Sequence, residues 1–470
     1  MQEKLPVAGS LHVKYRKAAI RMNHKDERLG TEPLGRLMFS LAVPSVAAQL
    51  INVLYNIVDR IYIGHIPEYG DVALTGVGVT FPILTMISAF SAFAGMGGAP
   101  LVSIQLGKQN KQKAEQILGN SAGLLVLCAV ILTVFFSVFK TPILYAFGAS
   151  DATITYARDY ITIYLIGTIF VQLALGLNAY ISGQGEAKIA MFSVLIGAVL
   201  NICLDPVFIF LFHLGVRGAA LATIISQAVS AAWVVRFLTS EKSVMRLTFK
   251  NMHLNGATIK MIAGLGISPF IMQSTESLVT ITLNTGLQKY GGDLYVGSMS
   301  ILMSIMQLIT IPVQGITQGI QPVISYNYGA GNIDRVKATL KRMILVCLSG
   351  TLVLAGVAIF FPEVYTGLFT NNKELLELTC KVMPVYFLGI SIFGIQCACQ
   401  TSFISLGQAK VSLFIALLRK IILLIPLAVI LPKFMGVMGI YRAEPVADTI
   451  SVLTTSVVFV ITMKKVLRNK

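Results

Sequence analysis

The feature that most limits how this chain can fold is a series of apolar stretches, each 20 or more residues long. A stretch of that length is sufficient to cross the hydrocarbon core of a bilayer, which is about 30 Å thick. Backbone N–H and C=O groups in lipid have no water to bond, so each stretch is predicted to be a helix. Only 12% of the 470 residues are charged, whereas about 25% is usual in a soluble domain. The sequence therefore predicts an all-α, polytopic membrane protein.

Twelve transmembrane helices are predicted from these stretches. No cleavable signal peptide is expected before them, because the first 36 residues are polar and basic without an apolar core. The expected spans cover residues 38–62, 73–98, 117–139, 157–182, 189–212, 217–238, 259–286, 294–317, 342–362, 381–405, 411–432 and 438–463.

The net charge of +16 is distributed unevenly along the chain. With twelve spans and the amino terminus inside, the cytoplasmic segments would hold 26 of the 37 Lys and Arg residues, and the outer loops seven. This positive-inside bias predicts that both termini are cytoplasmic. Because the bias explains the basic charge, nucleic acid is not an expected partner, and the expected environment is the lipid bilayer.

Landmark residues recur at a nearly constant spacing, which indicates an internal duplication. The first span needs a shift of 225 residues, which places Pro44 on Pro269. A shift of 222 residues aligns many others, including Asp71 with Asp293, Gly97 with Gly319, Pro100 with Pro322, Gly107 with Gly329 and Tyr164 with Tyr386. Each half holds six spans, and an even number returns the chain to the same side. The halves are therefore expected to be related by a pseudo-twofold axis along the membrane normal, with the substrate between them.

The repeat defines the predicted domains. A basic cytoplasmic tail covers residues 1–36, the amino-terminal lobe 37–238, a cytoplasmic linker 239–258 and the carboxy-terminal lobe 259–465. No Walker A, HExxH or GxSxG sequence is present. Enzymatic chemistry is therefore not expected, and neither is a cofactor.

Polar residues form a stripe along the first span. Gln49, Asn52, Asn56 and Asp59 lie within about 80° of one another on a helix. Lipid would repel this face, so it is expected to line a cavity or a neighbouring helix. Pro44 lies about four turns from Asp59 and is the predicted hinge, because its missing N–H interrupts the hydrogen-bond ladder.

The fifth and sixth spans carry matching polar positions. Asn201 and Asp205 lie one turn apart on the fifth span, and Thr223 lies on the sixth. If these faces meet Asp59, the four residues form an oxygen-rich cluster that suits either H+ or Na+. The alternative is a static hydrogen-bond network between helices.

The carboxy-terminal half carries a different set of polar residues. Gln273, Glu276, Thr280 and Asn284 form one stripe on the seventh span, and Met303 lies on the eighth. A carboxylate in an apolar cavity attracts lipophilic cations, and flexible Met side chains suit varied ligands. The alternatives are a Glu276 bonded to a neighbouring helix and methionines that only pack. The predicted substrate-binding residues are Asn52, Tyr55, Asn178, Gln273, Glu276 and Met303.

The two halves differ in their acids. The repeat places Asp59 on Asn284 and Asp205 on Leu427, so the paired acids occur in the amino-terminal half alone. Glu444 and Asp448 lie one turn apart in the last span, and a structural ion pair with Arg442 or Arg419 is the default expectation.

Several segments together resemble the MATE (multidrug and toxic compound extrusion) transporters, in particular the MepA-like branch. They are LINVLYNIVDRIYIGH at 50–65, NICLDPVFIF at 201–210, GVRGAALATIISQ at 215–227, QPVISYNYGAGN at 321–332 and AEPVAD at 443–448. The resemblance runs from about residue 33 to residue 465. It implies a V-shaped pair of six-helix lobes that exports cationic, amphipathic drugs by antiport with H+ or Na+.

The resemblance also implies roles for single residues. Asp59, Asn201, Asp205 and Thr223 match the cation site of the amino-terminal lobe, which would be a metal site only if Na+ is the coupling ion. Glu276 matches an important acid of the carboxy-terminal lobe. Some relatives pair that acid with an Asp in the tenth span, but residues 381–405 here contain no acid.

The predicted function is therefore multidrug efflux, and with it antibiotic resistance, by a monomer in the cytoplasmic membrane of a bacterium. Its expected partners are small cationic substrates. The alternative is a flippase for a lipid-linked precursor, which would favour a cavity rich in Arg and Lys.

Overall fold

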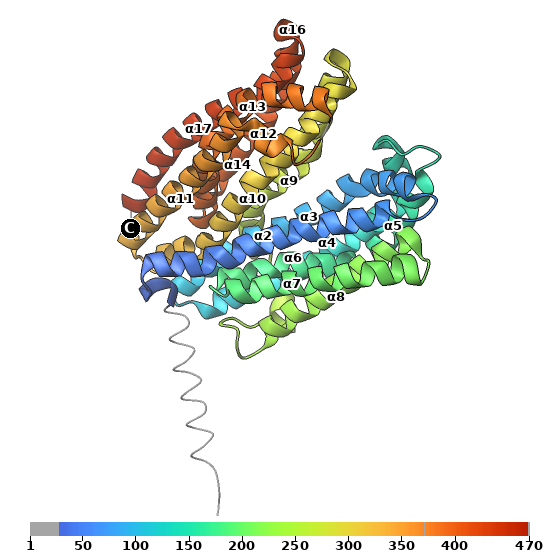
Figure 1. Cartoon of the computed structure of the whole chain (residues 1–470). Helices are drawn as coiled ribbons and strands as arrows, with labels where there is room; N and C mark the ends of the chain where they lie inside the picture. Colours follow the sequence, from blue (N-terminus) through green and yellow to red (C-terminus); the bar gives the residue numbers. More distant parts are fainter. Residues whose placement is uncertain (1–27, 371, 469–470) are drawn as a thin grey trace, which may run out of the picture.

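The computed structural model describes residues 28–370 and 372–468, and these residues form helices and no strand. Most of the predicted basic tail, residues 1–27, therefore lies outside the described residues. The helices form two lobes, one from each half of the chain (Figure 1). The first holds α2 (Leu34–Gly64), α3 (Gly70–Gly107), α4 (Lys111–Ala146), α5 (Ile154–Ile166), α6 (Thr168–Gly183), α7 (Ala187–Pro206), η1 (Val207–Leu211) and α8 (Gly215–Thr239).

The second lobe repeats this order after a short helix, η2 (Phe249–Met252), in the connection. It holds α9 (Gly256–Tyr290), α10 (Asp293–Gly329), α11 (Ile333–Phe360), α12 (Pro362–Thr366), α13 (Lys373–Ser405), α14 (Ala409–Leu417), η3 (Leu418–Leu424), α15 (Ile425–Ile430), α16 (Pro432–Met435) and α17 (Val437–Arg468). The predicted all-α, two-lobed fold is confirmed.

Ten of the described helices are long and apolar enough to cross a membrane, or eleven if a bent pair is counted as one span. The bent pair, α5 and α6, replaces the single helix predicted at 157–182, and the two parts meet at 60°. Gly167 lies at the bend, where a β-carbon would come within 2.5 Å of the Ile224 side chain. The seventh predicted span, α9, has 35 residues but is not among the apolar helices. Its polar stripe is the physical reason.

Glycines allow the two lobes to touch at one end of the molecule. A β-carbon added to Gly107 would lie 2.0 Å from the Tyr326 carbonyl oxygen, and one added to Gly329 would lie 2.1 Å from that of Ile104. Gly107 and Gly329 are equivalent in the repeat, so each lobe presents the same glycine to the other. Gly97 and Gly319, also equivalent, approach α9 and α2 in the same way. We call these four glycines the glycine seam.

Other contacts join the lobes at the same end, which holds the start of α2 and the ends of α3 and α10. Gln49 donates a hydrogen bond to Gln318 (2.9 Å), and the Asn327 amide donates one to the Leu29 carbonyl (2.9 Å). From this joined end the lobes diverge toward the ends of α2 and α9, as the sides of a V (Figure 1). Residues such as Asn56 and Gln307, farther along α2 and α10 from this end, are exposed.

The connection between the lobes is fixed to the first lobe. It is shorter than the predicted 239–258, because α8 continues to Thr239 and α9 begins at Gly256. The Asn120 side chain on α4 donates to the Asn251 carbonyl (3.2 Å) and accepts from the Asn255 backbone N–H (2.7 Å). This contact orients the start of α9 against α4.

Candidate functional site

The four residues of the predicted cation site come together inside the first lobe. The Asn201 amide, on α7, donates to Asp205 (3.2 Å) and to the Thr223 hydroxyl on α8 (3.5 Å). Asp59, on α2, lies close enough to Asp205 for the two carboxylates to affect each other electrostatically. Asn201 and Asp205 are almost fully buried, at 2% and 0% exposure. The spacing of the polar residues therefore located this cluster, whereas its role stays a prediction.

Several acceptor oxygens in this cluster have no donor. One oxygen each of Asp59, Asn201 and Asp205 is buried without a hydrogen-bond partner. A buried polar atom without a partner is costly, and two adjacent carboxylates repel each other. A proton shared by the carboxylates, or a small hard cation among the oxygens, would remove both costs. The described residues contain no cluster of three or more His, Cys, Asp or Glu.

The predicted substrate residues of this lobe lie near the cluster or on the neighbouring α6. Asn52 and Tyr55 are half-buried on α2, two turns and one turn before Asp59 respectively. Asn178, on α6, accepts a hydrogen bond from Ser193 (3.1 Å). Pro44 is buried within α2, which continues as one helix from Leu34 to Gly64. The predicted hinge therefore lies inside an unbroken helix here, and its role in a conformational change stays a prediction.

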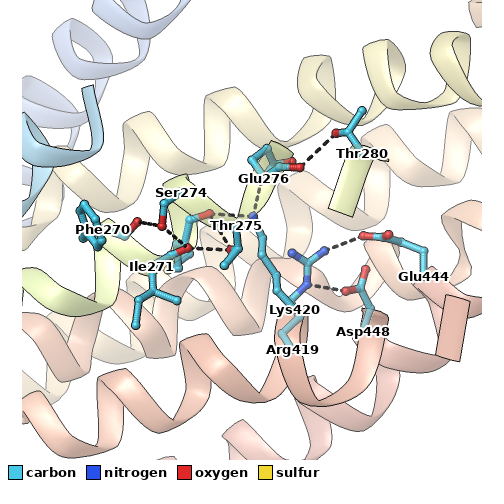
Figure 2. Close-up of polar contacts among 11 residues, drawn as sticks. Phe270, Ile271, Ser274, Thr275, Glu276, Thr280, Arg419, Lys420, Glu444 and Asp448 are labelled. Carbon is cyan, nitrogen blue, oxygen red and sulfur yellow. Dashed lines mark hydrogen bonds and ion pairs between the residues drawn. The ribbon is translucent and has the colours of Figure 1, made fainter. Parts of the chain in front are cut away.

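Glu276, the predicted acid of the second lobe, forms an ion pair that joins α9 to η3. Its partner is Lys420, whose ammonium also donates to the Met272 carbonyl (2.8 Å). Figure 2 shows the lysine reaching α9 from the neighbouring segment. The Glu276 side chain is 51% exposed and that of Lys420 only 9%. Glu276 is therefore both bonded to a neighbouring segment and open on one side. Gln273, one turn earlier on α9, and Met303, on α10, are half-buried.

The acids of the last span bind Arg419. Its guanidinium donates to Asp448 (2.6 Å) and to Glu444 (2.9 Å), and it stacks 4.4 Å from the centre of the Phe393 ring. Arg442, the other predicted partner, points instead to the Met435 sulfur (3.7 Å). These two ion pairs join η3 to α17, and both acids are buried.

Sequence reasoning did not find Lys420 as the partner of Glu276. A signal existed, since Arg419 and Lys420 are consecutive cations inside the apolar stretch IALLRKIILLIP. A buried cation in a span needs an acid. The sequence could not show that η3 is a π-helix or that its Lys420 side chain is buried against α9.

The fold and these acids define a class, a two-lobed, all-helical membrane protein with acidic groups within the membrane-spanning part of each lobe. The model of the MatE family matches residues 44–207 and again residues 269–430. The chain belongs to the MatE family. The two matched stretches begin at Pro44 and Pro269, the pair that the repeat aligns.

Relatives extend over nearly the whole chain. The multidrug export protein MepA of Staphylococcus haemolyticus (strain JCSC1435) is 26% identical over 436 residues, which cover 91% of this chain and 94% of that protein. MepA of Staphylococcus aureus (strain MSSA476) is 26% identical over 443 residues, covering 92% and 96%. These relatives are bacterial, and the chain is a multi-pass membrane transporter of their family.

Solved structures agree with the fold. One described as MATE in the bent conformation has a TM-score of 0.88 at 20% identity, over 95% of this chain and 98% of that one. An outward-facing multidrug resistance MATE family transporter of the MOP superfamily has a TM-score of 0.87 at 20% identity, over 94% and 98%.

Proposed function

We propose that this protein exports cationic, amphipathic compounds from a bacterial cell in exchange for H+ or Na+. The observation that carries this proposal is the Asp59–Asp205 pair, in which each acid has one buried oxygen without a donor. Carboxylates in such surroundings bind and release a small cation, and each exchange changes how the surrounding helices repel or attract one another. The names of the MepA relatives support the export of several drugs.

Charge orients the proposed transporter in the membrane. The positive-inside rule places both termini in the cytoplasm, so the joined end with the glycine seam faces the cytoplasm. The described arrangement then opens outward, and Asp59, near the far end of α2, takes up the ion from outside. Neutralising the two carboxylates allows α2 to bend near Pro44, which changes the surface that the first lobe offers to the substrate.

The substrate occupies the space between the lobes in this proposal. Asn52, Tyr55 and Asn178 contribute from the first lobe, and Gln273, Glu276 and Met303 from the second. The lobes then rock about the joined end and the ion is released to the cytoplasm, as in transporters built from parallel repeats. One protein molecule contains both lobes, so a monomer is sufficient.

A flippase for lipid-linked precursors is the alternative. Such a substrate carries a pyrophosphate, which would need free Arg or Lys side chains. In the described part of the second lobe, Arg419 and Lys420 are each bound by acids, and Glu276, Glu444 and Asp448 outnumber them. The balance of charge favours cationic substrates.

Transport in vesicles tests the proposal. The purified protein is placed in lipid vesicles, and movement of the fluorescent cation ethidium is followed under an imposed H+ or Na+ gradient. Asp59→Asn is expected to abolish gradient-driven transport, because it removes one of the two ion-binding carboxylates. Asp71→Asn, which changes an exposed acid at the start of α3, should transport normally. Normal transport by Asp59→Asn would remove this residue from coupling, and wild-type vesicles that ignore both gradients would refute antiport.

A further inference from the structure

The Glu276–Lys420 pair combines an accessible acid with an enclosed cation. Half of the Glu276 side-chain surface is exposed, whereas Lys420 is held inside the lobe by the acid and by the Met272 carbonyl. The ammonium thus reaches the carboxylate from within the lobe (Figure 2). The other side of the carboxylate stays open to a second cation.

Arg419 is not available for the same role. It is bound by Glu444 and Asp448, whose side chains are only 4% and 1% exposed, and Phe393 covers one face of its guanidinium. Among the three acids that bind these two cations, Glu276 alone has an open surface. A cation that reaches the exposed side of Glu276 therefore competes with Lys420.

The backbone that presents Lys420 is itself unusual. The segment η3 is a π-helix of seven residues, Leu418–Leu424, between α14 and α15. Single π-turns within α-helices are rare and are frequent at functional sites. Arg419 and Lys420 are consecutive residues of this segment, and they bind two separate sets of acids.

An aromatic surface lies between the lobes before Glu276 on α9. The Phe270 ring packs against Phe90 of α3, with ring centres 4.9 Å apart, and against Phe93 at 6.1 Å. Phe270 precedes Glu276 by six residues, or about 9 Å along a helix. An amphipathic cation has the two parts that this region can bind, an apolar body and a positive charge.

We infer that Lys420 is a tethered competitor for Glu276, so that its ammonium occupies the carboxylate until an amphipathic cation displaces it. The inference rests on the proposed function. A tethered group acts at an effective concentration in the mM range or above. A small cation that offers only its charge does not overcome that competition, whereas an amphipathic cation adds the binding energy of its apolar part. Lys420 is thus a specificity-determining residue that selects against simple ions.

The displaced lysine keeps another partner. The Met272 carbonyl accepts from its ammonium at 2.8 Å. The ammonium is therefore not left alone in the lobe when a substrate takes Glu276, which limits the cost of the exchange.

Binding to the full-length purified protein tests the inference. Ethidium fluorescence gives the dissociation constant, and tetramethylammonium serves as a competitor with a charge but little apolar surface. Lys420→Gln is expected to bind ethidium about tenfold more tightly, as the loss of one opposing charge predicts. Tetramethylammonium should compete for this variant and hardly for the wild type. Lys420→Arg, which keeps the charge, should resemble the wild type.

The gain must depend on Glu276. In the double variant Glu276→Gln/Lys420→Gln both charges are removed, and ethidium should bind as weakly as it binds to Glu276→Gln alone. Lys420→Met, with an unbranched apolar side chain, replaces Lys420→Gln if the latter does not fold, as judged by size-exclusion chromatography and thermal unfolding.

Two results would overturn the inference. If the wild type binds ethidium but removal of the Lys420 charge leaves binding unchanged or weaker, the lysine does not compete, and the proposed export is unaffected. If tetramethylammonium displaces ethidium from the wild type readily, the lysine does not select against simple ions, whatever the variants do. A wild type that neither binds nor transports organic cations would refute the proposed function and the inference together.

Discussion

The glycine seam predicts that one added methyl group opens the joined end. In Gly107→Ala the new carbon would lie 2.0 Å from the Tyr326 carbonyl oxygen and 2.9 Å from the Ala330 nitrogen. Ordinary contact begins at 3.4 Å. Both neighbours are backbone atoms that no side-chain rotation can move aside, so α3 and α10 must separate.

The size of the effect follows from this clash. Forcing an extra methyl group into packed structure costs about 1–3 kcal/mol. A cost of about 2 kcal/mol changes the ratio of joined to separated lobes about 30-fold. Gly329→Ala should have a similar effect, because Gly329 makes the equivalent contact with the Ile104 carbonyl at 2.1 Å.

Spin-label distances measure this separation. Labels at Gln112 and Lys337, in a background without the six native cysteines, report the distance between the lobes at the joined end by pulsed electron paramagnetic resonance. Gly107→Ala should give a longer and broader distribution than the unmodified glycine. Gly350→Ala is the matched control, because a β-carbon there meets no atom within 4 Å. Equal distributions for Gly107→Ala and Gly350→Ala would refute the reasoning.

Two further predictions concern contacts within and beside the lobes. Arg419→Met leaves Glu444 and Asp448 buried without their cation and should lower the free energy of unfolding by about 3–5 kcal/mol. The loss would be seen as a lower unfolding temperature in detergent, and Arg419→Lys should lose less. An Arg419→Met variant as stable as the wild type would contradict the assigned ion pairs. Asn120→Ala removes two hydrogen bonds to the connection, at a cost of about 1–3 kcal/mol, and should speed hydrogen exchange around Asn251. Unchanged exchange there would show that other contacts hold the connection.

The sequence by itself determined the class, the repeat and the position of the acid pair. Apolar length is a local property, and the bilayer converts it directly into helices. Asp59, Asn201 and Asp205 were located by the 3.6-residue period, because polar side chains within a span must face inward. The repeat was visible because equivalent residues, such as Pro44 and Pro269, occupy the same place in each half.

Only the tertiary structure decided which charged groups meet and where the lobes touch. Glu276 and Lys420 are separated by 144 positions, and their pairing depends on how α9 packs on η3, which no sequence periodicity reveals. The bend at Gly167 and the contact of Gly107 with Tyr326 likewise depend on a neighbouring helix. The sequence does not show whether another backbone approaches a given glycine, because the neighbour is determined only by how the helices pack.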